Sequence, residues 1–364
     1  MNILLLKFRH IGDVLISTPL LENLAHHYPG AQIDYALNKD CAEMVAGNPH
    51  VRDIIQYDRA KIKKQNFLAR VVSELRFARR IRRRKYDLVI SLTEGDRSAL
   101  LALLCRAPKR FGFRPPKGLF RMLPVYHRTG TWQRTHMIEK DLQFIPMLGK
   151  QIVSRKVSMY YAREDEDAAA DLITRHKLGK FIHLHAVSRW MFKCIADATM
   201  ARVIDHCAAR GYSVAVTASA DPAEMEKTAR ILALCESAPL NLAGKLTLKQ
   251  VGALNRRAEM FIGVDTAIMH LSAANDTPVF AFFGPSPARA WGPRDNDETT
   301  DATYPEKNGI QRMGKHMVFS ESRACQPCVS DGCNHSKISD CLMDMDFARI
   351  RGCIDGMLEE GAAR

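Results

Sequence analysis

The segment Gly263–His270 has the residue types of a diphosphate-binding turn. It reads Gly-Val-Asp-Thr-Ala-Ile-Met-His and joins an apolar stretch, 260–264, that predicts a buried strand to a helix directly after it. Such a junction presents free backbone N–H groups, and the first turn of a helix favours negative charge. Asp265 would cap the turn or hold a ribose hydroxyl, Thr266 would add a hydroxyl donor, and His270 lies one helical turn further on the same face. An ordinary capped helix with a core histidine fits this segment, taken alone, equally well.

A second candidate for anion binding is the loop that follows the predicted strand 180–185. It contains Ser188, Arg189 and Lys193. A hydroxyl and two cations can hold a phosphate by charge-assisted hydrogen bonds, and a lysine stabilises a leaving group more strongly as that group becomes more negative. A surface loop with ordinary basic residues is the alternative. The turn Gly-Pro-Ser-Pro at 284–287 follows another predicted strand in the same half, and three such strand ends together favour a binding site.

A carboxylate follows the first predicted strand, 2–7. The chain there continues as Lys7-Phe-Arg-His-Ile-Gly12-Asp13, in which Gly12 permits a tight turn. A carboxylate at this position suits a general base acting on a hydroxyl or a water, while capping of the following helix is its structural alternative. The chain has neither a GxGxxG fingerprint nor a Walker A loop, so hydride transfer and ATP hydrolysis are disfavoured.

These candidate residues require strands that end side by side. Both halves of the chain alternate short apolar runs with longer helical patterns, which predicts an α/β fold with one doubly wound parallel sheet in each half. We expect an N-terminal domain over 1–165, a C-terminal domain over 178–345 and a last helical segment, 346–364, that braces the first domain. Predicted strands are 2–7, 32–37, 52–57, 87–92, 180–185, 212–217, 240–243, 260–264 and 278–283. Residues 108–130 are expected to form an irregular substrate loop, and the linker is expected within 154–179.

The net charge of +13 implies an anionic partner: nucleic acid, an anionic bilayer surface or a phosphorylated substrate. Much of the excess lies in 59–85, where twelve Lys or Arg residues accompany a single acid, Glu74. Apolar residues recur there at helical spacing, namely Leu68, Val71, Val72, Leu75 and Ala78. This pattern is typical of a basic amphipathic helix that lies on a membrane, and an ordinary surface helix is the alternative. No apolar run approaches the roughly 20 residues of a spanning helix, and residues 1–6 are too short for a signal peptide, so we expect a cytoplasmic protein.

Four of the ten cysteines cluster in one short segment. Cys325, Cys328, Cys333 and Cys341 form a CxxC pair followed by two further thiols, a spacing that a tetrahedral zinc site can use. Reduced thiols or a disulfide are the alternatives. The DxD patterns at 295–297 and 344–346 follow no predicted strand and are too loose to indicate a metal site.

Taken together, these motifs resemble glycosyltransferase family 9, the ADP-heptose:lipopolysaccharide heptosyltransferases of Gram-negative bacteria. The resemblance rests on Lys7 with Gly12-Asp13, on the loop from His185 to Lys193, and on Gly263–His270 with the following Ala273-Ala274, Pro278 and Phe283-Gly284. It spans nearly the whole chain. The variant Phe192-Lys193-Cys194, with the opening segment, is most similar to the heptosyltransferase III branch.

The resemblance implies a GT-B architecture, in which two Rossmann-like domains face a cleft. It also implies an inverting, metal-independent transfer from ADP-L-glycero-D-manno-heptose to the lipopolysaccharide inner core. By position, Asp13 would be the base, Ser188 and Lys193 would hold the diphosphate, Asp265, Thr266 and His270 would line the ADP site, and Glu224 would contact the ribose. Lys7, Arg9, Arg110, Arg114 and His136 would bind the acceptor.

The implied partners are ADP-heptose and lipid A–core lipopolysaccharide, and nucleic acid is not expected. The enzyme would work in the cytoplasm, in peripheral contact with the inner membrane. No cofactor would be needed for catalysis. Separately from the resemblance, the cysteine spacing leaves three alternatives open: a structural zinc, reduced thiols or a disulfide.

The chain departs from the family pattern at two places. Ala267 follows Thr266 where glycine is common, and the usual Lys-x-Trp-Pro is replaced by Lys193-Cys194-Ile195-Ala196. These departures leave the donor sugar less certain than the transfer itself. Two alternatives therefore stay open: another GT-B enzyme, either a UDP-sugar transferase or an epimerase, and a nucleic-acid-binding protein that uses 59–85 and a zinc-bound cysteine cluster.

Overall fold

The structure is a computed structural model that describes residues 1–132 and 135–362. It divides into two compact units, Met1–Tyr160 and Tyr161–Arg364, each with its own sheet and hydrophobic core. Within the described residues, none of the helices combines the length and the hydropathy that crossing a bilayer requires.

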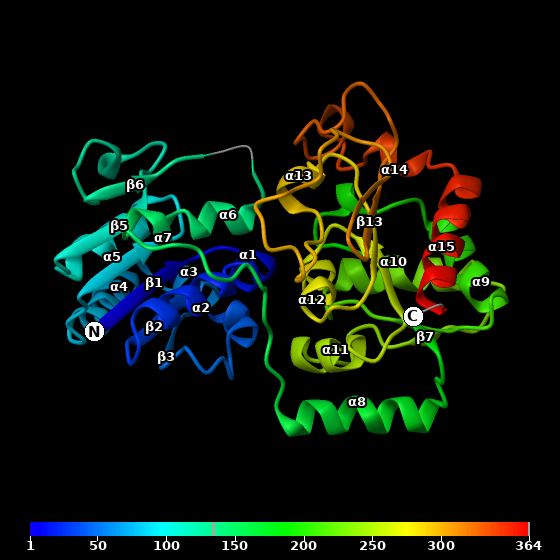
Figure 1. The fold of residues 1–364 in the computed structure, drawn as a ribbon, viewed down its shortest axis with the longest axis horizontal. Helices are drawn as coiled ribbons and strands as arrows, with labels where there is room; N and C mark the ends of the chain where they lie inside the picture. The colour runs from blue at the N-terminus through cyan, green and yellow to red at the C-terminus, as the bar shows by residue number, and fades with distance from the viewer. Residues whose placement is uncertain (133–134, 363–364) are drawn as a thin grey trace. The chain divides into compact units, whose positions relative to one another are not determined.

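The first unit is built on a six-stranded sheet in which all neighbouring strands are parallel. The strand order β3-β2-β1-β4-β5-β6 is that of a doubly wound dinucleotide-binding fold. The strands are β1 (Asn2–Lys7), β2 (Gln32–Asn38), β3 (Asp53–Tyr57), β4 (Leu88–Ser91), β5 (Lys109–Phe113) and β6 (Arg128–Gly130). The helices, shown from blue to green in Figure 1, are α1 (Ile11–Leu15), α2 (Thr18–His27), η1 (Lys39–Met44), α3 (Arg59–Lys63), α4 (Phe67–Arg82), α5 (Asp96–Leu104), η2 (Leu119–Arg121), α6 (Met137–Leu142) and α7 (Phe144–Met147).

The second unit repeats this strand order and adds one antiparallel strand. Its sheet runs β9-β8-β7-β10-β11-β13-β12, and only the β12–β13 pair is antiparallel. The strands are β7 (Phe181–His185), β8 (Ser213–Val216), β9 (Leu240–Asn241), β10 (Met260–Val264), β11 (Val279–Phe282), β12 (Gln311–Met313) and β13 (His316–Phe319). The helices are α8 (Arg163–His176), η3 (Met191–Lys193), α9 (Asp197–Ala209), α10 (Pro222–Ala233), α11 (Leu248–Asn255), α12 (Ala267–Ala274), α13 (Ala288–Trp291), η4 (Cys333–His335), α14 (Asp340–Met343) and α15 (Phe347–Ala362).

Local sequence explains where these elements begin. The central strands β1 and β10 are continuous apolar runs because helices cover both faces of a parallel sheet. Proline stands in the first turn of α2 and of α10, where no intrahelical N–H is needed. Asn66 caps α4 by accepting the backbone N–H of Ala69 at 2.9 Å.

One expectation about the fold was wrong, and one hairpin was not predicted. Residues 108–130, expected to be irregular, contain β5 and β6, because Phe111–Phe113 supply enough buried apolar surface to extend the sheet past β4. The boundary between the two units, at Tyr160–Tyr161, lies within the range 154–179 expected for the linker, and the rest of that range contains α8, which packs on α11. The hairpin β12–β13 was not predicted at all.

The last helix, α15, packs on α9 within the second unit. Ile350, Ile354 and Leu358 belong to the same hydrophobic cluster as β7 and β10. The expected bracing of the first domain by this helix stays a prediction.

Candidate active site

Three of the predicted motifs follow central strands of the two sheets. In a doubly wound sheet the ligand binds beyond the carboxyl ends of the strands, at the point where the strand order reverses. That point lies between β1 and β4 in the first unit and between β7 and β10 in the second. Asp13 follows β1, the loop Ser188–Lys193 follows β7, and Asp265 follows β10. Within each unit, the fold therefore brings the predicted motifs to the expected position.

At the end of β1, Lys7 forms an ion pair with Asp141 of α6. Both side chains are buried, at 2% and 1% exposure. Burial raises the pKa of Asp141 above its usual value, although the Lys7 ammonium acts in the opposite direction. The second carboxylate oxygen, Oδ1, has no hydrogen-bond partner in the described part of the chain. Lys7 therefore connects the end of β1 to α6 through a buried ion pair. Its predicted contact with the acceptor stays a prediction.

Glu94, shortly after β4, gathers two further cations. Its carboxylate lies 2.7 Å from the Lys140 ammonium and 3.7 Å from the Arg9 guanidinium. The Lys140 ammonium also lies 3.5 Å from the centroid of the Trp132 ring, a cation–π contact. Burial lowers the pKa of Lys140, although Glu94 counteracts this. Asp141, Glu94 and Lys140 were missed by sequence reasoning because they reach the end of β1 from distant segments.

Asp13 lies in the first turn of α1 and is partly exposed. Its carboxylate accepts a hydrogen bond from the backbone N–H of His10 at 3.3 Å, so the capping role weighed for it is present. The same charge contributes to the raised pKa of Asp141, which places the two carboxylates within electrostatic reach of each other. A partly exposed carboxylate beside the Lys7–Asp141 pair is suited to accept a proton, and its role as a base stays a prediction.

The remaining predicted acceptor residues make local contacts or face solvent. Arg110 donates to the backbone carbonyls of Ala107 at 2.7 Å and Val125 at 2.8 Å, which fixes the segment between β5 and β6. His136 is buried and caps α6 by accepting the backbone N–H of Ile138 at 3.3 Å. Arg114, after β5, is exposed. Their contacts with an acceptor stay predictions.

In the second unit, Lys193 and Asp265 form an ion pair across the ends of β7 and β10. The Lys193 ammonium lies 2.6 Å from Oδ2 of Asp265; the lysine side chain is 22% exposed and the carboxylate is buried. Burial alone would raise the pKa of Asp265, but Lys193 and a hydrogen bond from Ser286 hold it below its usual value. Ser286 lies in the Gly-Pro-Ser-Pro turn after β11, which the sequence identified as a strand-end candidate without giving it a role.

Thr266 precedes α12 and leaves its hydroxyl without a partner. It is the N-cap residue, yet its side chain makes no cap hydrogen bond, and Oγ1 is buried with no partner among the described residues. A buried hydroxyl beside the free N–H groups of a helix start is suited to an anionic ligand. His270, one turn further along α12, is buried and contributes to lowering the pKa of Asp265.

Ser188 and Glu224 are buried at two neighbouring strand ends. Ser188 accepts the backbone N–H of Trp190 at 3.2 Å, which closes the first turn of the Lys193 loop. Glu224, in the first turn of α10, accepts the backbone N–H of Ser219 at 3.1 Å. Ser188 thus lies in the loop that carries Lys193, and Glu224 lies after the adjacent strand β8. Their contacts with a ligand stay predictions.

A buried chain of hydrogen bonds, which the sequence did not reveal, ends at His185 on β7. The Asn255 amide donates to Nδ1 of His183 at 2.9 Å, so that Nε2 of His183 carries the proton and donates to the Thr217 hydroxyl at 2.8 Å. The Thr217 hydroxyl is also hydrogen-bonded to Nδ1 of His185, at 2.9 Å. Burial lowers the pKa of His183 to about 3 and that of His185 to about 4, so both rings are neutral. These hydrogen bonds therefore connect the last residue of β7 to Thr217 after β8 and to Asn255 of α11.

The strand ends of the second unit leave no room for a side chain at Gly263. A Cβ there would lie 2.5 Å from the Phe261 ring and 2.7 Å from the carbonyl oxygen of His185. Glycine at the start of the Gly263–His270 motif is therefore required by the close approach of β10 to the end of β7.

The cysteine-rich segment is hydrogen-bonded to the loops that follow β7 and β11. Ser339 donates to the carbonyl of Phe192 at 2.7 Å, the backbone N–H of Ala196 donates to Leu342 at 3.3 Å, and that of Val329 donates to Pro285 at 2.9 Å. Cys325 and Cys328 are exposed and Cys341 is buried. Within residues 1–132 and 135–362, no three His, Cys, Asp or Glu side chains are grouped so that they could hold a metal ion. The zinc at the four cysteines stays a prediction.

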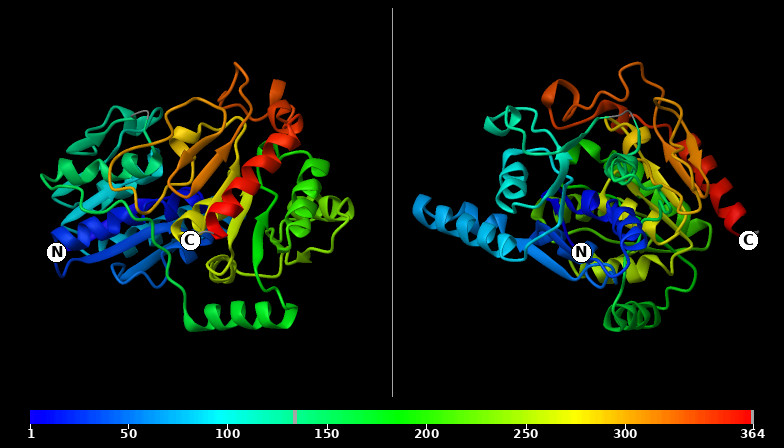
Figure 2. Two further views of the ribbon diagram at one scale, coloured as in Figure 1. Left: turned by 45° about the vertical axis from the view of Figure 1, so that its right-hand side comes forward. Right: turned by 60° about the vertical axis from the view of Figure 1, so that its left-hand side comes forward.

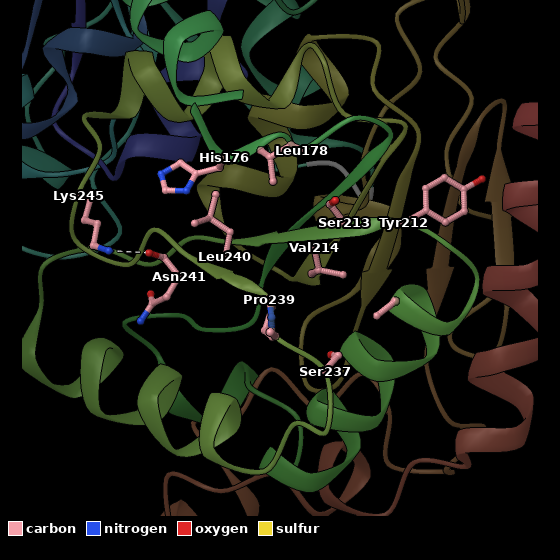
Figure 3. A pocket seen from close by; sticks show the side chains of 12 residues that line it. His176, Leu178, Tyr212, Ser213, Val214, Ser237, Pro239, Leu240, Asn241 and Lys245 are labelled. Atoms are coloured by element: carbon pink, nitrogen blue, oxygen red, sulfur yellow. Dashed lines mark hydrogen bonds between the residues drawn. The ribbon is translucent and has the colours of Figure 1, made fainter. Parts of the chain in front are cut away.

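A cavity of about 480 Å³ lies elsewhere in the second unit, between the start of β8 and β9. Figure 3 shows it between His176, Tyr212 and Pro239, with Lys245 bonded to the backbone of Asn241 at 2.8 Å. Because it does not lie at the carboxyl ends of β7 and β10, it is separate from the candidate site.

Comparison with known proteins agrees with this geometry. Residues 74–336 match the model of glycosyltransferase family 9 (heptosyltransferase). Over 79% of this chain and 85% of the relative, the sequence is 28% identical to lipopolysaccharide heptosyltransferase 3 of Escherichia coli. Two solved structures share the fold at 19% identity: a family 9 glycosyltransferase from Veillonella parvula (TM-score 0.79, 99% and 97% of the two chains) and the ADP-heptose lipopolysaccharide heptosyltransferase II of E. coli (TM-score 0.74, 99% of each).

These solved structures have the GT-B fold that the resemblance implied, and two Rossmann-like sheets are present here. With the family model covering well over half of its length, the chain belongs to glycosyltransferase family 9, the heptosyltransferases, and is a glycosyltransferase.

Proposed function

We propose that this enzyme transfers heptose from ADP-L-glycero-D-manno-heptose to the inner core of lipopolysaccharide, with inversion at the anomeric carbon and without a metal ion. The relatives, a lipopolysaccharide heptosyltransferase 3 and an ADP-heptose lipopolysaccharide heptosyltransferase II, support the donor and the acceptor class. The observation that carries the proposal is the Lys193–Asp265 ion pair beside the unpartnered Thr266 hydroxyl at the start of α12.

The second unit would bind the nucleotide sugar. The Lys193 ammonium is partly exposed, so it can contact a diphosphate while it remains paired with Asp265. The Thr266 hydroxyl and the backbone N–H groups of α12 would complete the diphosphate site. Asp265, Glu224 and His270 would contact the adenosine, and Ser188 would hold the diphosphate together with Lys193.

The first unit would supply the base. Asp13 would accept the proton of the acceptor hydroxyl as its oxygen bonds to the anomeric carbon of heptose. The bond from that carbon to the phosphate oxygen breaks at the same time, and the electron pair leaves with ADP. The developing negative charge falls on groups that Lys193 and the start of α12 stabilise, which is where such stabilisation lowers the barrier most. Arg9, Arg114 and the cations around Glu94 would orient the anionic acceptor.

The acceptor is anchored in lipid A, so the proposal places the enzyme in the cytoplasm, in peripheral contact with the inner membrane. No nucleic-acid role is proposed.

The proposal is tested by mass spectrometry of lipopolysaccharide from a strain that lacks this protein and from the same strain carrying a plasmid copy. We expect the mutant core to lack one heptose and the plasmid to restore it. In vitro, the purified enzyme should transfer heptose from the ADP-linked and not from a UDP-linked sugar. A complete core in the mutant, or transfer from the UDP-sugar alone, would contradict the proposal.

Metal independence has its own test. We expect excess EDTA to leave the initial rate of transfer unchanged, because proton removal and charge stabilisation are both assigned to side chains and backbone groups. A rate that falls with EDTA and returns with a divalent cation would contradict this. The metal content of the freshly purified protein tests the structural zinc separately.

A further inference from the structure

The helix α4 carries an exposed apolar stripe that no described residue of its own unit covers. Its inward face packs through Phe77 and Ile81, both in the second half of the helix. On the opposite side, Phe67 and Leu68 are 77% and 75% exposed, and Leu75 is 52% exposed. Val71 and Val72 continue the same stripe and are also exposed. The right-hand view of Figure 2 shows α4, in light blue, extending away from the sheet of its unit.

The second half of the same outer face is cationic. Arg79, Arg82 and Arg83 are exposed and share this face with Leu68 and Leu75, since positions three, four and seven apart align on a helix. No ion pair of these three arginines is recorded within the described residues, whereas Arg80 and Arg84, on the inner side, pair with acids of β2 and β3. The outer arginines are therefore available to an external anion.

We propose that this α4 face, defined as Phe67, Leu68, Val71, Val72 and Leu75 with Arg79, Arg82 and Arg83, docks on a bilayer that contains acidic phospholipid. The inference deepens the proposed function, because it assigns a surface to the membrane contact that a lipid-anchored acceptor requires. The apolar half of the face enters the headgroup region, and the arginines remain at the level of the lipid phosphates.

The chemistry of the face favours a bilayer over other partners. Nucleic acid would pair with the arginines but would leave five exposed apolar side chains in water. A second copy of the same face would bring two sets of arginines together, which costs energy through like-charge repulsion. An acidic bilayer satisfies both halves at once, since it offers an apolar interior beneath a layer of phosphates.

A neighbouring segment supplies a second contact of the same character. The helix α5 packs on α4, and η2 contacts α5. In and beside η2, Leu119 and Met122 are 73% and 84% exposed, and Lys117 and Arg121 lie in the same short segment.

Sedimentation of the full chain with vesicles tests the proposal. We expect binding to phosphatidylcholine vesicles that contain phosphatidylglycerol, and little binding to phosphatidylcholine alone. Replacing Arg79, Arg82 and Arg83 together by Gln should weaken binding on the order of 100-fold, at about fivefold for each cation near an anionic surface. A triple control, Arg175→Gln with Lys177→Gln and Lys180→Gln on exposed positions of the second unit, should bind as the wild type does.

For the apolar half of the face, the experiment measures how deeply its side chains enter the bilayer, in addition to the affinity for vesicles. Tryptophan placed by Leu68→Trp should be quenched by lipids brominated in their acyl chains, and tryptophan placed by Leu234→Trp, at an exposed position of α10's C-terminus, should not. Leu68→Ser with Leu75→Ser should lower vesicle binding about tenfold or more, while Leu234→Ser with Ile338→Ser should not.

Two controls separate this proposal from the proposed function. All α4 variants should transfer heptose normally to a soluble, deacylated core oligosaccharide, and vesicle binding is measured whether or not transfer occurs. Unchanged vesicle binding by both the Gln and the Ser variants would overturn the proposal. So would tighter binding of the face to duplex DNA than to acidic vesicles, or loss of a homodimer as the main effect of the Ser variants in analytical ultracentrifugation.

Discussion

The two units share one strand order and differ in what their strand ends carry. In the first unit the charged groups are acids and bases that pair with each other, as in Lys7–Asp141 and Lys140–Glu94, with Asp13 partly exposed beside them. In the second, the Lys193–Asp265 ion pair lies beside the start of α12, where the buried Thr266 hydroxyl has no hydrogen-bond partner among the described residues. One topology thus positions two different sets of side chains, and the proposed function assigns proton transfer to the first set and diphosphate binding to the second.

The largest expected effect is on the proton acceptor of the first unit. Asp13→Asn keeps the shape of the side chain and removes its basicity, so kcat should fall by about 10²–10⁴, the usual contribution of a general base. The measurement is the initial rate with saturating donor and acceptor. Asp87→Asn, on an exposed carboxylate before β4, is the matched control and should retain full activity. Retention of wild-type kcat by Asp13→Asn would end the assignment.

The buried Lys7–Asp141 ion pair at the end of β1 should affect the free energy of unfolding more than kcat. Lys7→Met leaves the Asp141 carboxylate buried and unpaired, which should lower the free energy of unfolding by about 3–5 kcal/mol. The double variant Lys7→Met with Asp141→Leu removes both charges and should recover most of that loss. Urea denaturation checks both values. If the double variant is as unstable as the single one, the pairing does not explain the stability.

On the donor side, Lys193→Met tests the charge near the leaving group. Its loss should lower kcat by about 10²–10³, the range for removing one preorganised donor, and should also weaken ADP binding. Lys245→Met, beside the separate cavity of Figure 3, removes a lysine from the same unit and should change neither quantity. Equal effects of the two substitutions would show that Lys193 has no special position.

The smallest effect at neutral pH concerns the histidine chain behind the donor site. Burial lowers the pKa of His183 to about 3 and of His185 to about 4, below the value near 6.5 expected in the unfolded chain. At a pH between the folded and the unfolded pKa values, the unfolded chain binds protons that the folded chain does not. The free energy of unfolding should therefore fall as the pH drops from about 6.5 towards 4. Above pH 7 it should not depend on these two histidines.

Thermal unfolding across this pH range checks the histidine prediction. His183→Gln should flatten the acid limb of the stability curve, whereas His176→Gln, at an exposed position, should leave it unchanged. Identical curves for the wild type and His183→Gln would contradict the assignment of the pH dependence to buried histidine.

Periodicity and turn residues predicted the elements that dominate the two cores. The central strands β1 and β10 were predicted with their observed bounds, since continuous apolar runs next to glycine or a helix cap leave little choice. The strands β5 and β6 were missed, because proline and glycine between residues 108 and 130 suggested an irregular loop. The β12–β13 hairpin was missed as well: it is short and lies at the sheet edge.

The candidate site residues that the sequence indicated lie in segments that follow a strand. Asp265 comes directly after β10, Asp13 lies in α1 after β1, and Lys193 lies in η3 after β7. The sequence did not indicate Asp141, because it meets Lys7 from 134 residues away along the chain, and no local pattern encodes such a contact. The Thr217 hydroxyl is equally hidden, since its role depends on the pairing of β7 with β8 and on two histidines that share one face of β7.

The central claim is that Asp13 of the first unit acts as the base and Lys193 of the second unit binds the diphosphate. Calorimetric titration of ADP into the wild type, Asp13→Asn and Lys193→Met tests this claim most directly. The account predicts that Asp13→Asn binds ADP as tightly as the wild type although it does not transfer heptose, and that Lys193→Met binds ADP more weakly. Weak binding by Asp13→Asn together with unchanged binding by Lys193→Met would contradict it.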